Sequence, residues 1–276
     1  MNKKNLKKTV IAASETANPG DGTINNSSEP PLILAIETSG RFGSVALAQG
    51  AKLVDEIEFS APLKHSTELF PSVNTLLAKF KKTPDQIRQI HISVGPGSFT
   101  GLRIAATFAK TMNLAFSFIK IVAVSTLDVI AANIINVTAD KENTACESAS
   151  LLKQQRQKIA VVLDAKRNQF FIAAYECKKN KWVKTLDDCL ITAPEFIEKC
   201  AGSEVPVWLL GEGLVYYKDK FKAPGIEFLE KRYWYPKASK VHQEGWKLAL
   251  EDKFSDPITL SPVYLRKAIV SEKRKQ

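Results

Sequence analysis

The sequence predicts an α/β protein made of two lobes, and three observations support this class. Short apolar stretches typical of strands alternate with longer segments of helical periodicity along most of the 276 residues. Twice, at Glu37 and at Asp164, an acidic residue ends a buried type of strand before a turn and a return strand. The segment Ala139–Gln157 between these two patterns is charged, polar and poor in aromatic residues. We therefore expect one lobe on each side of that segment.

Composition restricts the class of protein further. With 45% hydrophobic residues the chain can bury a sizeable core, and no apolar run has membrane length, so we expect a soluble, cytoplasmic protein with no membrane partner. The apolar stretch near the basic start is too short for a secretion signal. The four cysteines form no C-x-x-C pair, so zinc and redox motifs are not expected. The formal net charge of +10 suits a phosphate-rich or acidic partner.

Four segments follow from these patterns. Residues 1–31 are polar and end in two prolines, so we predict a disordered extension. Residues 32–138 form the first lobe, and residues 159–276 form the second lobe with a basic tail. Residues 139–158 are a linker or an insertion between them.

Periodicity and turn residues place the elements of each lobe. The first lobe has strands at Leu32–Ile36, Ser44–Ala48 and Leu53–Phe59, a helix from about Ser66 to Phe80, a strand at Ile90–Val94, a helix from about Leu102 to Ala115, a strand at Ile119–Val124 and a helix capped by Ser125. The second lobe has strands at Ile159–Leu163, Phe170–Tyr175 and Val207–Leu210 and a final helix at about Ala238–Leu250. Gly211 and Gly213 follow the last of these strands and permit a close backbone approach.

A glycine-rich turn joins the fourth strand to the second long helix. Its residues are Gly95, Pro96, Gly97, Ser98, Phe99, Thr100 and Gly101. A strand that enters a helix through such a turn can form an anion cradle, because backbone N–H groups and the helix dipole point the same way. The lysine of a P-loop is missing, however. Ser98 is placed to cap the helix, which we favour over a nucleophile because no base is marked nearby.

The helix that follows is apolar over most of its circumference, so we expect it to be covered on two sides. One interpretation is a core helix within its own chain, and the other is that its second face meets another protein. Arg103, a polar residue at the start of this helix, either pairs with Glu37 or another carboxylate or reaches a partner.

These motifs resemble the TsaB (YeaZ) family, and the likeness covers roughly residues 32 to 268 in collinear order. The matching stretches are SVGPGSFTGLRIA at 93–105, LAIETS at 34–39, HSTELFP at 65–71, VSTL at 124–127, VLDAKR at 162–167 and PVYLR at 262–266. Many members have Asp where this chain has Glu37, and the stretch 182–235 matches only loosely. The resemblance implies two lobes of the actin-like ATPase fold, which the repeated acidic hairpin also suggests.

The resemblance further implies a subunit without its own catalysis that partners a TsaD-like threonylcarbamoyltransferase. That enzyme forms threonylcarbamoyladenosine beside the anticodon of tRNAs that decode ANN codons, a TsaE-like ATPase is the third member, and tRNA is reached through the complex. A homodimer through the same contact is an alternative for the lone chain. The implied partner surface lies on the two long helices of the first lobe and comprises Leu69, Val73, Leu76, Leu102, Ala105, Phe108, Ala109 and Met112.

The resemblance leaves little chemistry for this chain itself. TsaD carries an H-x-x-x-H metal pair, whereas this chain has His65 and then Leu69, so we expect no metal. We expect this chain to bind no cofactor of its own, and ATP or ADP to bind only at an interface between subunits. Glu37, Asp164, Gly211 and Gly213 are candidates for a residual nucleotide cleft, and hydrogen bonding across the turns is the alternative.

Two functions from other classes stay open at the level of sequence. An actin-like phosphotransferase or ATPase that acts on a small molecule would use the same lobes. A direct tRNA binder would account for the positive charge.

Overall fold

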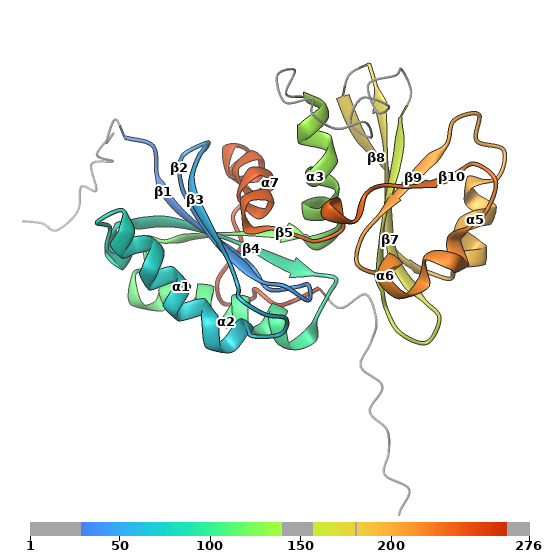
Figure 1. Ribbon diagram of the computed structural model, residues 1–276. Coiled ribbons are helices and arrows are strands. Elements are labelled where there is room, and N and C mark those ends of the chain that lie inside the picture. The colour runs from blue at the N-terminus through green and yellow to red at the C-terminus, as the bar shows by residue number, and fades with distance from the viewer. Residues whose placement is uncertain (1–28, 140–156, 180, 264–276) are drawn as a thin grey trace, which may run out of the picture. The chain divides into compact units, whose positions relative to one another are not determined.

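The computed structural model describes residues 29–139, 157–179 and 181–263, and these contain two five-stranded mixed sheets (Figure 1). The predicted extension at 1–31 and the predicted linker at 139–158 lie almost wholly outside the described residues. Both therefore stay predictions, as do the lobe boundaries drawn from them.

The first sheet has the strand order β3-β2-β1-β4-β5. Its strands are β1 (Leu32–Glu37), β2 (Ser44–Gln49), β3 (Lys52–Glu58), β4 (Ile87–Gly95) and β5 (Lys120–Ser125). The first three form an antiparallel meander, and β4 and β5 continue parallel to β1. β1 lies at the centre and is buried along its whole length, which explains its continuous apolar sequence.

The second sheet repeats this arrangement with the order β10-β9-β6-β7-β8. Its strands are β6 (Lys158–Asp164), β7 (Phe170–Lys178), β8 (Lys181–Ile191), β9 (Val207–Leu210) and β10 (Ile226–Phe228). Again an antiparallel meander is followed by two strands parallel to its first member. The predicted duplication is thus confirmed, and so is the fold class, because this strand order is that of an actin-like ATPase lobe.

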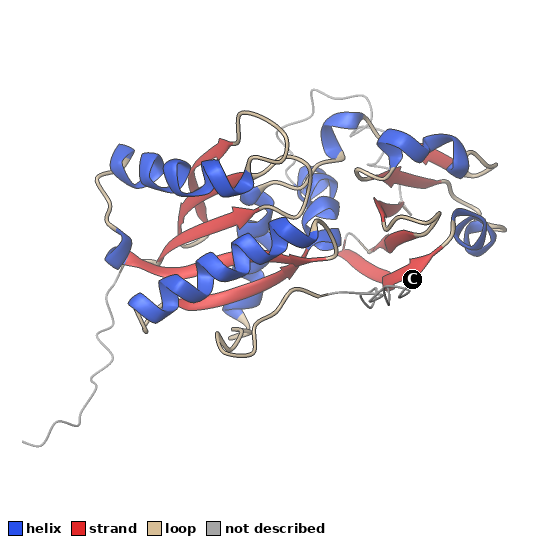
Figure 2. Ribbon diagram, turned by 90° about the horizontal axis from the view of Figure 1, so that it is seen from below, coloured by secondary structure: helices blue, strands red, loops and turns tan. Residues whose placement is uncertain are grey.

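Helices cover both faces of the first sheet. The helices are α1 (His65–Lys79), α2 (Phe99–Ala115), α3 (Thr126–Ala139), α5 (Ala193–Cys200), α6 (Leu214–Tyr217) and α7 (Ala238–Leu250), with short 3-10 turns at Pro84–Gln86, Lys218–Phe221 and Lys231–Tyr233. α1 and α2 lie side by side on one face, as Figure 2 shows, and α7 lies on the other. Alternate residues of β1 face these two layers: Leu34 and Ile36 face α1 and α2, and Ala35 faces α7.

Four strands and α-helices of the second sheet region were not predicted. They are β8, α5, α6 and β10. A signal for α5 was present, because Thr192 and Glu195 form a capping box at its start. Its Phe196 packs edge-on against Phe221, which packs in the same way against Phe170 of β7.

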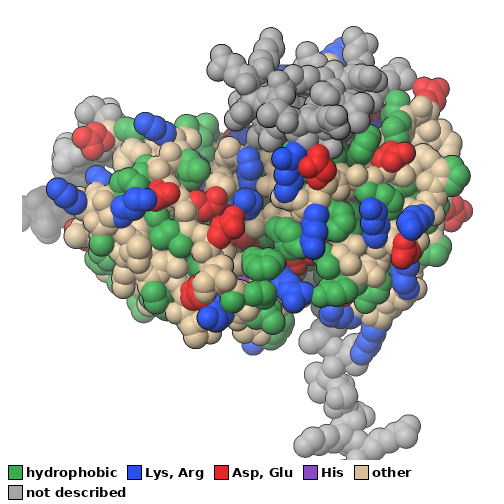
Figure 3. Space-filling view, viewed as in Figure 1, with side chains coloured by type: hydrophobic (Ala, Val, Ile, Leu, Met, Phe, Trp, Pro, Cys, Tyr) green, Lys and Arg blue, Asp and Glu red, His purple; other side chains and the backbone are tan. Residues whose placement is uncertain are grey.

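Charged side chains of both signs are scattered over the face drawn in Figure 3. In the full sequence, 39 Lys and Arg residues outnumber 29 Asp and Glu residues. Of the described helices, none combines the length and the apolar character that a membrane span requires.

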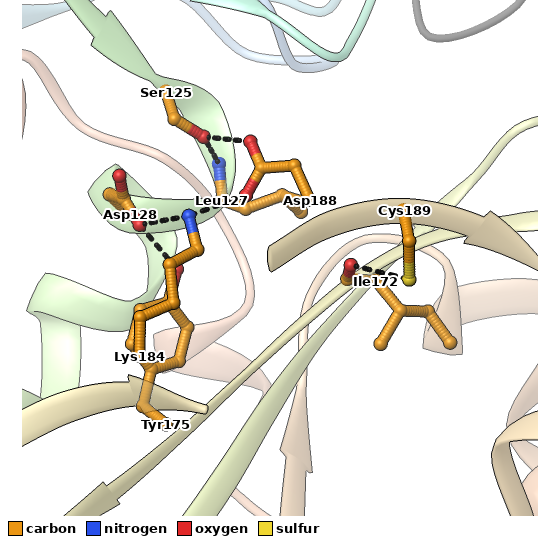
Figure 4. A network of polar contacts seen from close by, with 8 residues as sticks. All are labelled: Ser125, Leu127, Asp128, Ile172, Tyr175, Lys184, Asp188 and Cys189. Carbon is orange, nitrogen blue, oxygen red and sulfur yellow. Dashed lines mark hydrogen bonds and ion pairs between the residues drawn. The ribbon is translucent and has the colours of Figure 1, made fainter. Parts of the chain in front are cut away.

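α3 follows β5 in the chain and packs both against β4, β5 and α7 and against β6 and β7 of the second sheet. A polar network joins it to that sheet (Figure 4). Asp128 accepts a hydrogen bond from the Tyr175 hydroxyl over 2.5 Å and pairs with Lys184 at 2.8 Å. Lys184 also pairs with Asp188, which accepts a hydrogen bond from the Ser125 hydroxyl over 2.6 Å. The segment from β5 into α3 is therefore bonded to two neighbouring strands of the second sheet.

Candidate functional site

The candidate site is the set of turns at which the strands of the two sheets end. Glu37 at the end of β1 is fully buried. Its carboxylate accepts hydrogen bonds from the Ser39 N–H and hydroxyl, both over 2.5 Å, and from the Ser93 hydroxyl. Burial raises the pKa of Glu37, and these hydrogen bonds lower it by less. The carboxylate thus stabilises its own turn, as the hydrogen-bonding alternative predicted.

The glycine-rich turn after β4 lies directly on this first hairpin turn. The Ser98 N–H donates to the Ser39 carbonyl over 2.7 Å. The Thr38 hydroxyl donates to the Gly101 carbonyl over 2.7 Å. A Cβ at Gly101 would lie only 1.8 Å from the Thr38 carbonyl oxygen, so the position requires glycine. The space in which a phosphate would meet the start of α2 is therefore filled by the backbone of the first hairpin turn.

The start of α2 confirms the role expected for Ser98. The helix begins at Phe99, three residues earlier than predicted, and Ser98 is its N-cap. The Ser98 hydroxyl accepts the Gly101 N–H over 3.3 Å. The Gly95–Pro96 peptide bond that leads into this turn is cis.

The turn after β9 is packed against β6 in a similar way. Gly211 has φ +119°, and a Cβ there would lie 2.3 Å from the Val162 carbonyl oxygen. The Gly213 N–H donates to the same oxygen over 3.0 Å. These glycines therefore allow the close backbone approach that the sequence predicted, and the neighbour they approach is β6 of the same chain.

Asp164, the counterpart of Glu37 in the second sheet, stabilises the turn that follows it. Its carboxylate accepts the Lys166 N–H over 2.7 Å and pairs with the Lys166 ammonium over 2.7 Å. Three successive residues of this turn, Lys166, Arg167 and Asn168, have φ of 63°, 54° and 62°. The turn thus differs from the small-residue turns that wrap a phosphate.

Glu212, which the sequence did not single out, connects the turns of the two sheets. Its two carboxylate oxygens lie 2.9 and 3.2 Å from the backbone nitrogen of Arg41, which donates to them. The Arg41 guanidinium donates to the Tyr216 hydroxyl over 2.5 Å. Burial raises the pKa of Glu212 to about 7; the Arg41 N–H lowers it and the charge of Glu37 raises it by smaller amounts. Glu212 therefore changes its charge near neutral pH.

We expect Glu212→Gln to gain stability relative to the parent protein as the pH rises from about 4.5 to about 7. The pKa of Glu212 in the folded chain lies above the ordinary glutamate value of 4.5, so in this window the folded chain holds a proton that the unfolded chain has released. The parent's free energy of unfolding then falls with rising pH, by at most about 1.4 kcal/mol per pH unit. Glutamine does not ionise and still offers an acceptor to Arg41.

Urea denaturation of parent and variant from about pH 5 to about pH 8 measures this difference. Glu227→Gln, at an exposed position of β10, controls for the loss of one carboxyl group. A difference between Glu212→Gln and parent that stays constant across this range would contradict the assignment.

His65 begins α1 and is buried, with its Nε2 3.1 Å from the Gly40 carbonyl oxygen. Burial lowers the pKa of His65. Leu69, one helical turn further, is fully buried in the core. Among the residues that the structure describes, no three His, Cys, Asp or Glu side chains are grouped so that they could hold a metal ion.

The side chains that the sequence assigned to a partner surface lie mostly in the core of this chain. Buried are Leu69, Val73 and Leu76 of α1 and Leu102, Ala105, Phe108 and Ala109 of α2, and Met112 is partly buried. α2 is covered on two sides, but by its own sheet and by α1. This corrects the choice of residues. A glutamate at Ala105 or Ala109 would be placed in the core and would not test partner binding.

Other residues of the same two helices are exposed. We call Phe70 and Asn74 of α1 and Thr107, Thr111 and Leu114 of α2 the α1–α2 surface. The Phe70 side chain is 58% exposed although its ring packs 5.2 Å from that of Phe108, and Leu114 is 86% exposed. These large exposed apolar groups mark a surface that a partner can cover.

Arg103 lies beside this surface. It is exposed, and its guanidinium lies 3.8 Å from the centre of the Phe99 ring. The Glu37 carboxylate takes its hydrogen bonds from Ser39 and Ser93. Arg103 is therefore not paired with Glu37, and its contact with a partner stays a prediction.

Taken together, these contacts define an actin-like α/β protein in which the glycine-rich turn is packed against the first hairpin turn. The family model of the tRNA N6-adenosine threonylcarbamoyltransferase TsaD matches residues 60–207, more than half of the chain. The tRNA threonylcarbamoyladenosine biosynthesis protein TsaB of Bacillus subtilis (strain 168) is 29% identical over 187 residues, which cover 67% of this chain and 73% of that protein. The protein of the same name from Escherichia coli (strain K12) is 24% identical over 242 residues, 87% of this chain and 97% of that protein.

Solved structures show the same fold. YeaZ from Pseudomonas aeruginosa aligns with a TM-score of 0.67 at 20% sequence identity, over 85% of this chain and 100% of that chain. The chain therefore belongs to the TsaD-related family and, within it, to the TsaB (YeaZ) family.

Proposed function

We propose that this chain is a partner subunit, without catalysis of its own, of a TsaD-like threonylcarbamoyltransferase. In this role it is needed for threonylcarbamoyladenosine formation at the adenosine beside the anticodon in tRNAs that decode ANN codons. The names of its relatives and the TsaD family model support the pathway. The geometry supports the role of a subunit rather than that of the enzyme.

The single observation that carries this proposal is the contact between the first hairpin turn and the start of α2. In an active actin-like lobe these elements hold phosphate. Here the Gly101 backbone approaches Thr38 too closely for even one added methyl group, and Glu37 is bonded to serines. A nucleotide in the complex would then lie at an interface with another subunit and not in this cleft.

The proposed partners follow from the same assignment. A TsaD-like protein covers the α1–α2 surface, a TsaE-like ATPase is the third member, and tRNA is bound through the complex in the cytoplasm. The lone chain would use the α1–α2 surface for a homodimer when the TsaD-like partner is absent.

An actin-like small-molecule phosphotransferase or ATPase is the alternative function. The filled first turn and the long basic side chains of the second turn disfavour it. Isothermal titration with ATP and Mg²⁺, together with a hydrolysis assay on the lone chain, distinguishes the two functions. Tight binding with turnover would replace the subunit proposal by the phosphotransferase.

We expect Thr107→Glu to weaken binding of the TsaD-like partner at least about tenfold while the thermal unfolding temperature stays close to that of the parent. Thr107 is an exposed residue of the α1–α2 surface, so glutamate can be solvated in the free protein but must lose water in the complex. Binding is measured by titration calorimetry with the purified partner. Threonylcarbamoyladenosine formation by the complex reconstituted from this chain, the TsaD-like protein and the TsaE-like ATPase should fall in parallel.

Thr185→Glu is the matched control, because Thr185 is exposed on β8 of the second sheet. Equal partner binding by parent, Thr107→Glu and Thr185→Glu would remove the α1–α2 surface from the proposal. Absence of any complex between the parent and the TsaD-like protein would overturn the proposed function itself.

A further inference from the structure

The turn between β6 and β7 has a backbone that its side chains do not favour. Lys166 and Arg167 adopt left-handed conformations, which residues with a Cβ rarely occupy, and Asn168 follows in the same region. Both basic side chains are exposed. Glycine would fit this backbone better than arginine, so the sequence keeps long cationic side chains at the tip of the turn at a cost in stability.

Neighbouring residues extend this tip into one continuous surface. The Lys220 ammonium donates to the Asn168 side chain and lies 5.6 Å from the centre of the Tyr217 ring. Lys166 interacts electrostatically with Tyr216 and Tyr217. We call the exposed residues concerned the basic–aromatic surface: Arg41, Lys166, Arg167, Tyr216, Lys218 and Lys220.

Positive charge dominates this surface. Among its acidic neighbours, Asp164 is only 17% exposed and is paired with Lys166, and Asp219 is paired with Lys222. Arg167 takes part in none of the ion pairs that the described residues form. Figure 3 shows Lys and Arg side chains interspersed with Asp and Glu side chains over the part of the drawn face that carries the second sheet.

The basic–aromatic surface also contains one exposed aromatic ring, that of Tyr216. The Tyr216 side chain is 69% exposed, and its hydroxyl accepts a hydrogen bond from Arg41 that fixes the ring in place. Tyr217 beside it packs edge-on against the core residue Phe170, with ring centres 5.4 Å apart, and so anchors the segment. An exposed, held ring among cations is the arrangement on which proteins stack an unpaired base while lysine and arginine contact the phosphates.

We propose that the basic–aromatic surface binds the phosphodiester backbone of an RNA, with an unstacked base against Tyr216. This assigns to the lone chain an RNA contact of its own, separate from the α1–α2 surface. The choice of RNA over DNA rests on the proposed function. The contact itself rests on the charge and geometry of the surface.

The sharpest test exploits the unfavourable backbone of the turn. Arg167→Gly should raise the thermal unfolding temperature, because glycine accepts a positive φ, and should weaken RNA binding about fivefold near 0.1 M salt, the effect of one lost phosphate contact. Lys179→Gly is a matched control: Lys179 is exposed in the β7–β8 turn with φ 51°, so the change removes the same charge and the same strain elsewhere. It should leave RNA binding unchanged.

The probe is an unmodified, fluorescently labelled tRNA transcript, and the readout is anisotropy with the full chain at several salt concentrations. The slope of log K against log[salt] should fall by about 0.7 in Arg167→Gly. Tyr216→Ala should weaken RNA binding without changing this slope. Tyr216→Phe keeps the aromatic ring and should therefore retain most of the RNA affinity of the parent.

Equal losses in Arg167→Gly and Lys179→Gly would overturn the proposal, as would the absence of RNA binding by the parent. Equal affinity for a DNA duplex of similar length would overturn the assignment to RNA. None of these results affects complex formation with the TsaD-like protein, which Thr107→Glu tests separately.

Discussion

Replacing Gly101 by alanine should destabilise the protein by about 3 to 5 kcal/mol. The new methyl group would lie 1.8 Å from the Thr38 carbonyl oxygen, which belongs to backbone and cannot move aside as a flexible side chain would. α2 would have to shift away from the first hairpin turn. That shift would break the hydrogen bond from Thr38 to the Gly101 carbonyl and the one from Ser98 to Ser39. Alanine otherwise favours a helix, so intrinsic propensity works against the expected loss.

Chemical denaturation measures this effect, and Gly202→Ala provides the comparison. Gly202 has φ +79° with no atom within 4 Å of an added Cβ, so its substitution should cost only about 1 kcal/mol. Gly101→Ala should also bind the TsaD-like partner more weakly, because α2 carries most of the α1–α2 surface. Equal stability of the two variants would show that the first hairpin turn and α2 are not held in close contact.

The second large expected effect is a loss of stability at acidic pH, caused by the buried histidine His91 that packs against α7. His91 of β4 is fully buried against His242 of α7, with the rings stacked 5.7 Å apart, and its Nε2 lies 3.0 Å from the Gln89 amide oxygen. Burial first, and the neighbouring charge of His242 to a smaller extent, lower the pKa of His91 to about 3. Between the ordinary histidine pKa of 6.5 and about 3, the unfolded chain therefore binds a proton that the folded chain does not.

The free energy of unfolding should consequently fall as the pH falls below 6.5, by about 1.4 kcal/mol per pH unit from His91 alone, or about 2 kcal/mol at pH 5. Glu212 acts in the opposite direction over part of this range, since its folded pKa is raised. The total curve is therefore less informative than the difference between the parent and His91→Leu, which cannot titrate. We expect this difference to shift in favour of the variant as the pH falls.

Denaturant titrations at intervals from about pH 7 to about pH 4.5 give this difference. The chain has three histidines, and all of them are buried, so His65→Leu tests whether another of them accounts for the slope. Parallel curves for the parent and His91→Leu would contradict the burial of His91 as a neutral group.

The fold was predicted well where strands are buried on both faces. β1 reads as a continuous apolar run after Pro31, and β4 carries Ile90, Ile92 and Val94 directly before Gly95 and Pro96. Such patterns have few alternatives in a folded α/β protein. β8 lies at the edge of the second sheet and mixes apolar and charged residues such as Trp182 and Lys184 on one face, without a regular alternation, and it was missed. β10 has only three residues, too few for a periodic pattern.

The site was predictable in part. The glycine-rich turn, the cap at Ser98 and the acidic residues at equivalent strand ends followed from local chemistry. The partner residues did not, because an apolar pattern around a helix cannot tell which side meets its own sheet. Ala105 and Ala109 appeared suited to a partner but lie in the core. Glu212 gave no signal, since it meets Arg41 across 171 positions of sequence.

The position of α7 has a consequence for the order in which the protein can be completed during synthesis. This helix comes from the far end of the described chain, yet it covers one face of the sheet with which the first lobe begins. On the ribosome, β1 through β5 emerge long before α7. The sheet face that α7 covers therefore stays exposed until the second lobe has been translated. A premature stop anywhere before α7 would leave that face open to water and to other nascent chains, and the first lobe is not expected to mature as a separate product.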